Sequence, residues 1–430
     1  MTWGMAIWSY NEGSKIPTPN MNSIAEDGIK FTDAHSASAV CTPSRYGLLT
    51  GRYPWRTRLK KGVIFDYDDF LINAKRPTLG SVLQDKGYTT ACIGKWHLGM
   101  GWKRDDEGEV GFSQTVQAGP TERGFDYYFG IRASLDMPPY CFIENDHTVG
   151  IPNKEKYPYN SQQIKGKMVS GWKDEEVGPT LTEKAVEFIK RHERENSEKP
   201  FFLYFPTSAP HRPYMPPDFI EGKSDAGPRG DMVAEIDWTV GELIKTLKQK
   251  DIYDKTLFIV TSDNGAQLKN YNGKDYGHRS NGPLRGQKKD IWDGGHRETF
   301  LARWPGYVDA RSNCDETISL NDLIKTFSSL FNIDLPKNAG EDSYDITPAL
   351  LGEEYNDPIH EATVHHSIMG KLAIRKESWK LILSRGSGGH SEPRLVESSP
   401  GEPAGQLYNM ETDPQKRYNL WLDRQDIVHQ

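Results

Sequence analysis

The chain has 430 residues, a formal net charge of −7 at pH 7 and 36% hydrophobic residues. This length and apolar fraction suffice for one large α/β domain and a smaller one, each with its own core. Acidic and basic residues are interspersed, which argues against a nucleic-acid or anionic-membrane partner, and no apolar run approaches the ~18 residues of a membrane span. The four cysteines are too few for a disulfide framework and match no zinc pattern.

The first predicted helix begins beside Cys41. Pro43 suits a first helical turn, residues 44–49 continue the helix, and Gly51 ends it. Cys41 is therefore expected at a helix N-terminus, where exposed amide N–H groups lower the pKa of a thiol and attract an anion. A small buried residue is the alternative interpretation of this cysteine.

Three later segments share one pattern, a helix followed by an apolar strand. The pattern predicts helices over 79–86, 181–189 and 233–247 and strands over 88–93, 201–205 and 257–261. Polar side chains follow each strand: Lys95 and His97 after the first, His211 after the second, Asp263 and Asn264 after the third.

Helices alternating with strands predict an α/β fold with a large mixed, mostly parallel sheet sandwiched by helices. Such sheets bind ligands beyond the carboxyl ends of their strands, where these polar residues lie. Cationic groups beside a carboxylate and an amide fit an oxyanion bound next to Ca²⁺ or Mg²⁺. Taken singly, each residue also fits an ordinary turn or loop, so the prediction depends on their combination.

The composition changes near residue 355, which divides the sequence into a predicted catalytic α/β domain over 1–355 and a C-terminal α+β subdomain over 356–430. The segment KLAIRKESWKLILS, residues 371–384, alternates like an antiparallel hairpin with one exposed face. Residues 384–406 form a Gly/Pro/Ser-rich loop, interpreted either as a wall of the cleft that shapes substrate choice or as a disordered excursion.

Several ordered motifs resemble one family. The segments CTPSR (41–45) with LTGR (49–52), GKWHLG (94–99), PH (210–211), DNG (263–265), LRGQK (284–288), DGGHR (293–297) and GQLYNMETDPQKRYNL (405–420) are similar to motifs of the type I, formylglycine-dependent sulfatases of the alkaline phosphatase superfamily. The resemblance covers nearly the whole chain.

The resemblance implies a role for each matching residue. Cys41 would become Cα-formylglycine through a formylglycine-generating or anaerobic sulfatase-maturating enzyme. The remaining catalytic residues would be Arg45, Lys95, His97, His211 and Lys288. The metal ligands would be Asp263 and Asn264, and the substrate contacts Ser134 and His278. For the last two, a capping serine and an ordinary loop histidine are the alternatives.

The activity implied is hydrolysis of a sulfuric ester, with a sulfated carbohydrate as substrate and a periplasmic or secreted location, although the first residues lack the pattern of a signal peptide. Two rival functions stay open. One is a phospho- or phosphonate-monoester hydrolase of the same superfamily. The other is an inactive glycan-binding protein whose metal site is incomplete.

The sequence departs from the family at its beginning. Family members start with an apolar strand that ends in two adjacent metal-binding aspartates, and this sequence starts at about the next residue. We therefore expect that the strand and any export signal are encoded upstream of Met1. Asp27, Asp33 and Asp66 are other carboxylates, but their contexts indicate a helix end and loops.

Overall fold

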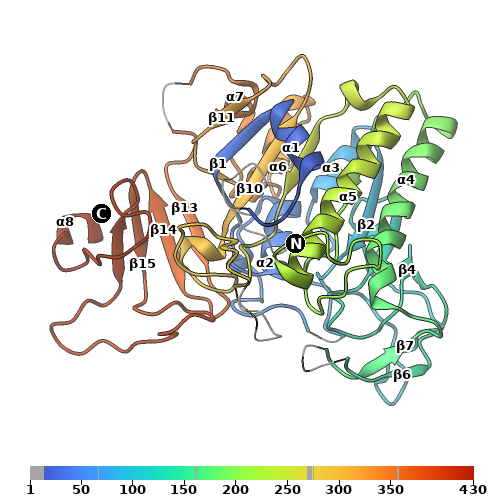
Figure 1. Ribbon diagram of the computed structural model, residues 1–430, viewed down its shortest axis with the longest axis horizontal. Helices are drawn as coiled ribbons and strands as arrows, with labels where there is room; N and C mark the ends of the chain where they lie inside the picture. The colour runs from blue at the N-terminus through green and yellow to red at the C-terminus, as the bar shows by residue number, and fades with distance from the viewer. Residues whose placement is uncertain are drawn as a thin grey trace.

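The computed structural model describes residues 14–65, 67–159, 161, 163–268, 274, 276–355 and 358–430. Asp66 and the residues before Ser14, both considered in the sequence analysis, lie outside this range. Figure 1 shows a large region of helices and sheets beside a smaller, red-orange C-terminal sheet. No helix in the described part of the chain combines the length and apolarity needed to cross a bilayer.

One sheet of the large region has the strand order β11-β1-β10-β9, with β12 also paired to β1. The strands are β1 (Ile29–His35), β9 (Phe258–Thr261), β10 (Arg297–Arg303), β11 (Ser312–Cys314) and β12 (Ile318–Ser319). Strand β10 is antiparallel to both of its neighbours, whereas β11 and β12 are parallel to β1.

A second sheet has the order β5-β4-β3-β2-β8. It contains β2 (Thr89–Lys95), β3 (Tyr127–Ile131), β4 (Ile143–Glu144), β5 (His147–Thr148) and β8 (Phe201–Tyr204). Strands β3, β2 and β8 are parallel, so their carboxyl ends meet at one edge, as predicted for β2 and β8. The third predicted strand, β9, lies in the first sheet instead and pairs antiparallel with β10. A small hairpin of β6 (Lys154–Lys156) and β7 (Gly166–Met168) extends beyond this sheet.

Helices cover both faces of the sheets. On one side α1 (Pro19–Glu26), α4 (Val177–Glu195) and α5 (Gly227–Gln249) contribute to one hydrophobic cluster. On the other side α2 (Cys41–Thr50), α3 (Leu79–Asp85) and α6 (Leu323–Leu330) contribute to another. The remaining α-helices, α7 (Thr347–Leu351) and α8 (Gln425–Val428), are short. This layering confirms the predicted α/β fold.

Local signals in the sequence account for several of these boundaries. Thr78 forms a capping box with Ser81 at the start of α3, and Gly87, with φ +93°, follows its end. Helix α2 ends at Gly51, whose φ of +62° is unfavourable for residues with a side chain. Helix α3 therefore begins at its predicted cap, and α2 ends at its predicted glycine.

The C-terminal sheet is antiparallel throughout. It pairs β13 (Thr363–His366), β14 (Leu372–Lys376), β15 (Trp379–Ile382) and β16 (Gln406–Asn409) in sequence order. The pairing of β14 with β15 confirms the hairpin predicted from the alternating pattern. The domain boundary at 355/356 stays a prediction, and residues 356 and 357 lie outside the described range.

Candidate active site

Cys41 is the first residue of α2 and is buried. Its sulfur accepts a hydrogen bond from Lys288 Nζ at 3.3 Å. Burial alone would raise the pKa of the thiol. The charges of Lys288 and Lys95 nevertheless hold the pKa well below its usual value. Position 41 is therefore an anion-stabilising site at a helix N-terminus.

Arg45 lies one turn further along α2 and is almost fully buried. Its Nε and one terminal nitrogen each lie 2.8 Å from Asp263 Oδ2, and the other terminal nitrogen donates to the Lys95 carbonyl at 2.5 Å. Because Lys95 ends β2 and Asp263 follows β9, this one guanidinium ties the carboxyl ends of the two sheets to the helix of Cys41.

Lys95 and His97 follow β2 directly. The Lys95 ammonium is buried and has no hydrogen-bond partner among the described residues. His97 has φ +61° and its Nε2 lies 3.0 Å from the Ile64 carbonyl oxygen. Since a carbonyl only accepts, Nε2 carries the proton and Nδ1 the lone pair. Burial and the Lys95 charge lower the pKa of His97 to about 4, so its imidazole is neutral near pH 7.

His211 follows β8 on a loop that returns to Cys41. Its Nδ1 lies 3.0 Å from the Arg212 carbonyl oxygen and 3.7 Å from Asp136 Oδ1. Burial and the charge of Lys288 lower the pKa of His211 to about 4, against the opposing charge of Asp136. The imidazole is therefore neutral, and Nδ1 carries its proton because the carbonyl requires a donor there.

Asp263 and Asn264 are buried at the end of β9. The Asn264 side-chain nitrogen donates to the Gly265 carbonyl at 3.2 Å, so the amide oxygen is the candidate ligand atom. A carboxylate and an amide oxygen are the ligand types that Ca²⁺ and Mg²⁺ prefer. The pair fits part of such a site, since these ions take six or more ligands.

The two predicted substrate contacts differ in their surroundings. Ser134 is buried, and its hydroxyl has no hydrogen-bond partner among the described residues, which does not support a capping role. It follows β3 on a loop joined to His97 by the hydrogen bond from His97 N–H to the Arg132 carbonyl. His278 instead lies near Arg229 and Lys15, and no hydrogen bond within the described residues joins it to the Cys41 group.

Other polar residues near the cleft were not singled out by sequence reasoning. Asp136 Oδ2 accepts from Arg212 Nε at 2.9 Å, and Lys289 Nζ lies 3.2 Å from His390 Nε2. Lys289 and Arg212 adjoin predicted site residues in sequence, which is the signal that could have identified them. His390 comes from the 384–406 loop, so that loop does pack beside this region.

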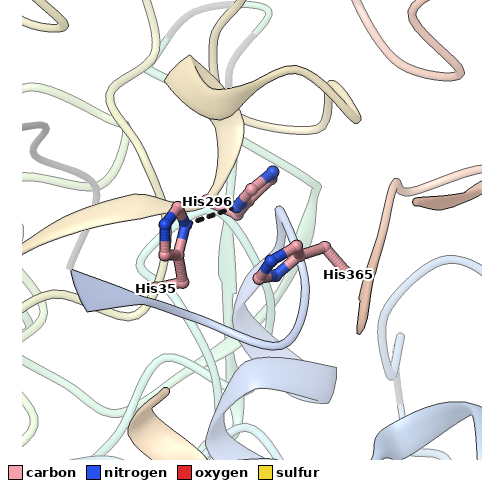
Figure 2. A group of neighbouring side chains, drawn as sticks. All are labelled: His35, His296 and His365. Carbon is pink, nitrogen blue, oxygen red and sulfur yellow. Dashed lines mark hydrogen bonds between the residues drawn. The ribbon is translucent and has the colours of Figure 1, made fainter. Parts of the chain in front are cut away.

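A second polar cluster lies between β1, β10 and the C-terminal sheet (Figure 2). It consists of three buried histidines, His35, His296 and His365, with one ring nitrogen of each within 4.8 Å of the others. His35 Nδ1 and His296 Nδ1 are 3.0 Å apart. No sequence pattern assigns a role to these side chains, because their positions are far apart in the chain.

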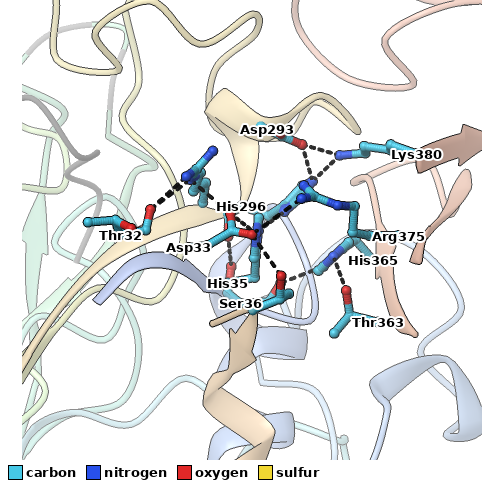
Figure 3. Close-up of polar contacts among 12 residues, drawn as sticks. Thr32, Asp33, His35, Ser36, Asp293, His296, Thr363, His365, Arg375 and Lys380 are labelled. Atoms are coloured by element: carbon cyan, nitrogen blue, oxygen red, sulfur yellow. Dashed lines mark hydrogen bonds and ion pairs between the residues drawn. The ribbon is translucent and has the colours of Figure 1, made fainter. Parts of the chain in front are cut away.

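The three imidazole rings belong to a hydrogen-bonded network of side chains rather than to a metal centre (Figure 3). Lys380 Nζ lies 2.7 Å from His296 Nε2, and His35 Nε2 lies 3.0 Å from Asp33 Oδ1. The His296 and His365 rings are stacked, with centroids 4.0 Å apart and planes 11° apart. A neighbouring ammonium and two parallel rings oppose convergence of the ring lone pairs on one cation.

This region also holds the segment that precedes Cys41. His365 Nδ1 lies 3.2 Å from the Ser36 carbonyl oxygen, and the N–H of Ala39 donates to the His366 carbonyl at 3.0 Å. In return, the N–H of His366 donates to the Ala37 carbonyl at 3.2 Å. Strand β13 of the C-terminal sheet therefore positions the backbone that leads into α2.

Comparison with known proteins gives consistent matches. The model of the Sulfatase family matches residues 2–333. An N-acetylgalactosamine-6-O-sulfatase from Bacteroides thetaiotaomicron is 32% identical, over 99% of this chain and 89% of the relative. Arylsulfatase A from Bos taurus is 32% identical, over 98% of this chain and 82% of the relative. A solved structure concerned with metabolism of multiple glycosaminoglycans by Bacteroides thetaiotaomicron superposes with a TM-score of 0.86 at 30% identity, covering 99% and 95% of the two chains.

Proposed function

Because the chain belongs to the sulfatase family, we propose that it removes sulfate from a sulfated carbohydrate with Cys41, converted to Cα-formylglycine, as the nucleophile. The observation that carries this proposal is the contact of Cys41 Sγ with Lys288 Nζ at the start of α2. The site stabilises a negative charge at position 41, as an attacking oxygen at this position requires.

The hydrated aldehyde would supply one hydroxyl to attack sulfur and a second whose deprotonation releases the sulfate. His97 supports this chemistry with its own geometry. Its Nε2 proton is held by the Ile64 carbonyl, so the neutral ring offers the Nδ1 lone pair to accept a proton. We assign His97 the role of proton acceptor at position 41.

The charge of the sulfuryl group would be balanced by residues that follow two strands, β2 and β8, and by a lysine from the segment between β9 and β10. Lys95 provides a buried ammonium with no other partner among the described residues, and Lys288 provides a second beside Cys41. His211 completes this set. An anionic ester would raise the depressed pKa of its imidazole, which favours protonation of the leaving alcohol from His211 or Lys288.

Asp263 and Asn264 would hold a Ca²⁺ or Mg²⁺ ion, which polarises a sulfate oxygen when bound. Further ligands are needed.

The substrate class rests on the relatives. One relative is named for N-acetylgalactosamine 6-sulfate, and a structure that is 25% identical, with a TM-score of 0.73, contains a neocarrahexaose. We propose a galactose or N-acetylgalactosamine sulfate as the substrate of this chain. We also propose a periplasmic or secreted location and dependence on a formylglycine-generating or anaerobic sulfatase-maturating enzyme.

The decisive experiment compares 4-nitrophenyl esters of sulfate, phosphate and phenylphosphonate, which share one leaving group. The chain is co-expressed with a maturating enzyme and assayed with each ester. Sulfate release that is lost in Cys41→Ala supports the proposal. Faster hydrolysis of the phosphorus esters would reassign the enzyme to that rival class, and binding of sulfated glycans without turnover would indicate the glycan-binding alternative.

A further inference from the structure

We propose that Lys289, together with His390 and Arg212, forms a second anion site beside the proposed sulfate site of Lys95, Lys288 and His211, and that this second site binds another acidic group, a carboxylate or a second sulfate, on the same glycan. The inference rests on the proposed function, because it adds a specificity element to that cleft. It narrows the substrate class from sulfated sugars to sugars that carry two acidic groups close together.

The backbone of Lys289 is held in an uncommon conformation. Its φ of +86° is unfavourable for a residue with a side chain. The conformation is fixed from both sides, because the N–H of Lys289 donates to the Ala39 carbonyl at 2.8 Å and its carbonyl accepts from the N–H of Ile368 at 3.0 Å. Strain of this kind persists where the surroundings impose it, and it clusters at binding sites.

His390 is held just as firmly against this segment. Asp290 Oδ1 accepts from the backbone N–H groups of His390 and Ser391 at 2.6 and 3.0 Å, and Asp290 Oδ2 accepts from the Ser391 hydroxyl at 2.5 Å. A Cβ at Gly389 would lie 2.4 Å from the Lys289 carbonyl oxygen, so glycine permits the close approach. The imidazole next to Lys289 Nζ is therefore preorganised.

The positive charge of Lys289 is not neutralised by an ion pair. Among the ion pairs of the described residues, none joins Lys289 to a carboxylate. Burial and the nearby charges of Lys288 and Arg212 lower the pKa of Lys289 to about 8. The two acidic groups in this neighbourhood already have partners: Asp136 is bound to Arg212, and Asp290 accepts from the backbone of His390 and Ser391. An anion placed here would relieve the repulsion between the cations.

The position of the Lys289 ammonium separates anion binding from the hydrolysis step at Cys41. Lys288 contacts the Cys41 sulfur, whereas the ammonium of the next residue contacts His390 on the 384–406 loop. Lys289 would bind the anionic group equally strongly in the substrate and in the transition state, because no charge changes at that group during hydrolysis. Its loss should therefore raise KM and leave kcat largely in place.

The test uses Lys289→Gln, which removes the charge, Lys289→Arg, which retains it, and Lys325→Gln as an exposed control. The substrates are 4-nitrophenyl sulfate, with one anion, and two disaccharides with the same scissile 6-sulfate, one bearing a uronic acid and one a second sulfate. In Lys289→Gln the rise in KM should be about tenfold greater for a disaccharide than for the nitrophenyl ester, and Lys289→Arg should restore most of it. The disaccharide with the greater loss identifies the anion.

Equal changes in KM for all three substrates, or a loss confined to kcat, would overturn the proposal. If the wild-type enzyme hydrolyses none of the esters, the proposed function fails separately. Calorimetric binding of the same disaccharides to the Cys41→Ala protein then tests the anion site. Weaker binding in Cys41→Ala/Lys289→Gln supports the site, and equal binding or none refutes it.

Discussion

The ammonium of Lys288 lies 3.3 Å from the sulfur of Cys41, at the first residue of α2. The two residues are 247 positions apart in the chain, so the fold itself creates this contact. It places a cation and a helix N-terminus at one atom, and both stabilise a negative charge there. In the unmodified chain this charge would be a thiolate.

We therefore predict that unmodified Cys41 ionises well below the usual pKa of a thiol, because the charges of Lys288 and Lys95 outweigh its burial. Lys288→Gln should shift the titration to higher pH. Thiolate absorbance near 240 nm, measured against pH in protein made without a maturating enzyme, checks this. Cys41→Ala identifies the signal of this thiol, and an ordinary thiol pKa at position 41 would contradict the electrostatic account.

Arg45→Ala should lower the free energy of unfolding by about 3 to 5 kcal/mol, because it leaves the buried Asp263 carboxylate without its ion pair. Urea denaturation of the protein without metal measures this loss. Arg194→Ala, at an exposed pair with Glu195, is the matched control and should change stability by less than about 1 kcal/mol. Equal losses of unfolding free energy in the two variants would mean that the ion pair of Arg45 with Asp263 does not stabilise the fold.

Asp263→Asn should weaken Ca²⁺ binding, since it removes the charge of a proposed ligand. Ca²⁺ should raise the Tm of the wild type more than that of the variant at equal concentration. Asp254→Asn, at an exposed carboxylate, should retain the wild-type response. The same Ca²⁺-dependent increase in Asp263→Asn would remove Asp263 from the metal site.

The buried histidine network predicts a loss of stability in mild acid. Burial is the largest cause that lowers the pKa of His35, His296 and His365. The folded state then binds fewer protons than the unfolded state below the unfolded pKa of about 6.5. The stabilisation is complete above that pH and is lost as the pH falls toward the folded pKa values.

Thermal unfolding between pH 8 and pH 5 measures this effect. The Tm should fall below pH 6.5, and His365→Gln should show a shallower dependence because it removes one titrating ring. A Tm that rises or stays constant across this range in the wild type would show that the histidines do not oppose protonation.

The sequence predicted the elements that position the site because their signals are local. Thr78 and Gly51 mark helix boundaries through the backbone itself, and the apolar runs before Lys95 and Asp263 identify their strands. The ends of β2 and β8 meet at one edge of a parallel sheet, which is why the polar residues after these two strands could be expected together. Asp263 follows β9 of the other sheet, and Arg45 links it to this group.

The rest depends on side-chain positions that no local pattern encodes. The histidine network joins β1, β10 and β13, and its members have no common spacing. The hydrogen bonds between β13 and residues 37–39 are made by backbone groups, which any sequence provides. The approach of His390 to Lys289 depends on how the 384–406 loop folds back, which its composition left open.

The most direct test of the account is the mass of the tryptic peptide 31–45, isolated from protein of the native organism or co-expressed with a maturating enzyme, together with sulfatase activity of the same sample. Conversion of Cys41 to an aldehyde lightens this peptide, and we predict that the converted fraction rises in proportion to activity. A sample that hydrolyses sulfate esters with its Cys41 thiol fully intact would contradict the central claim.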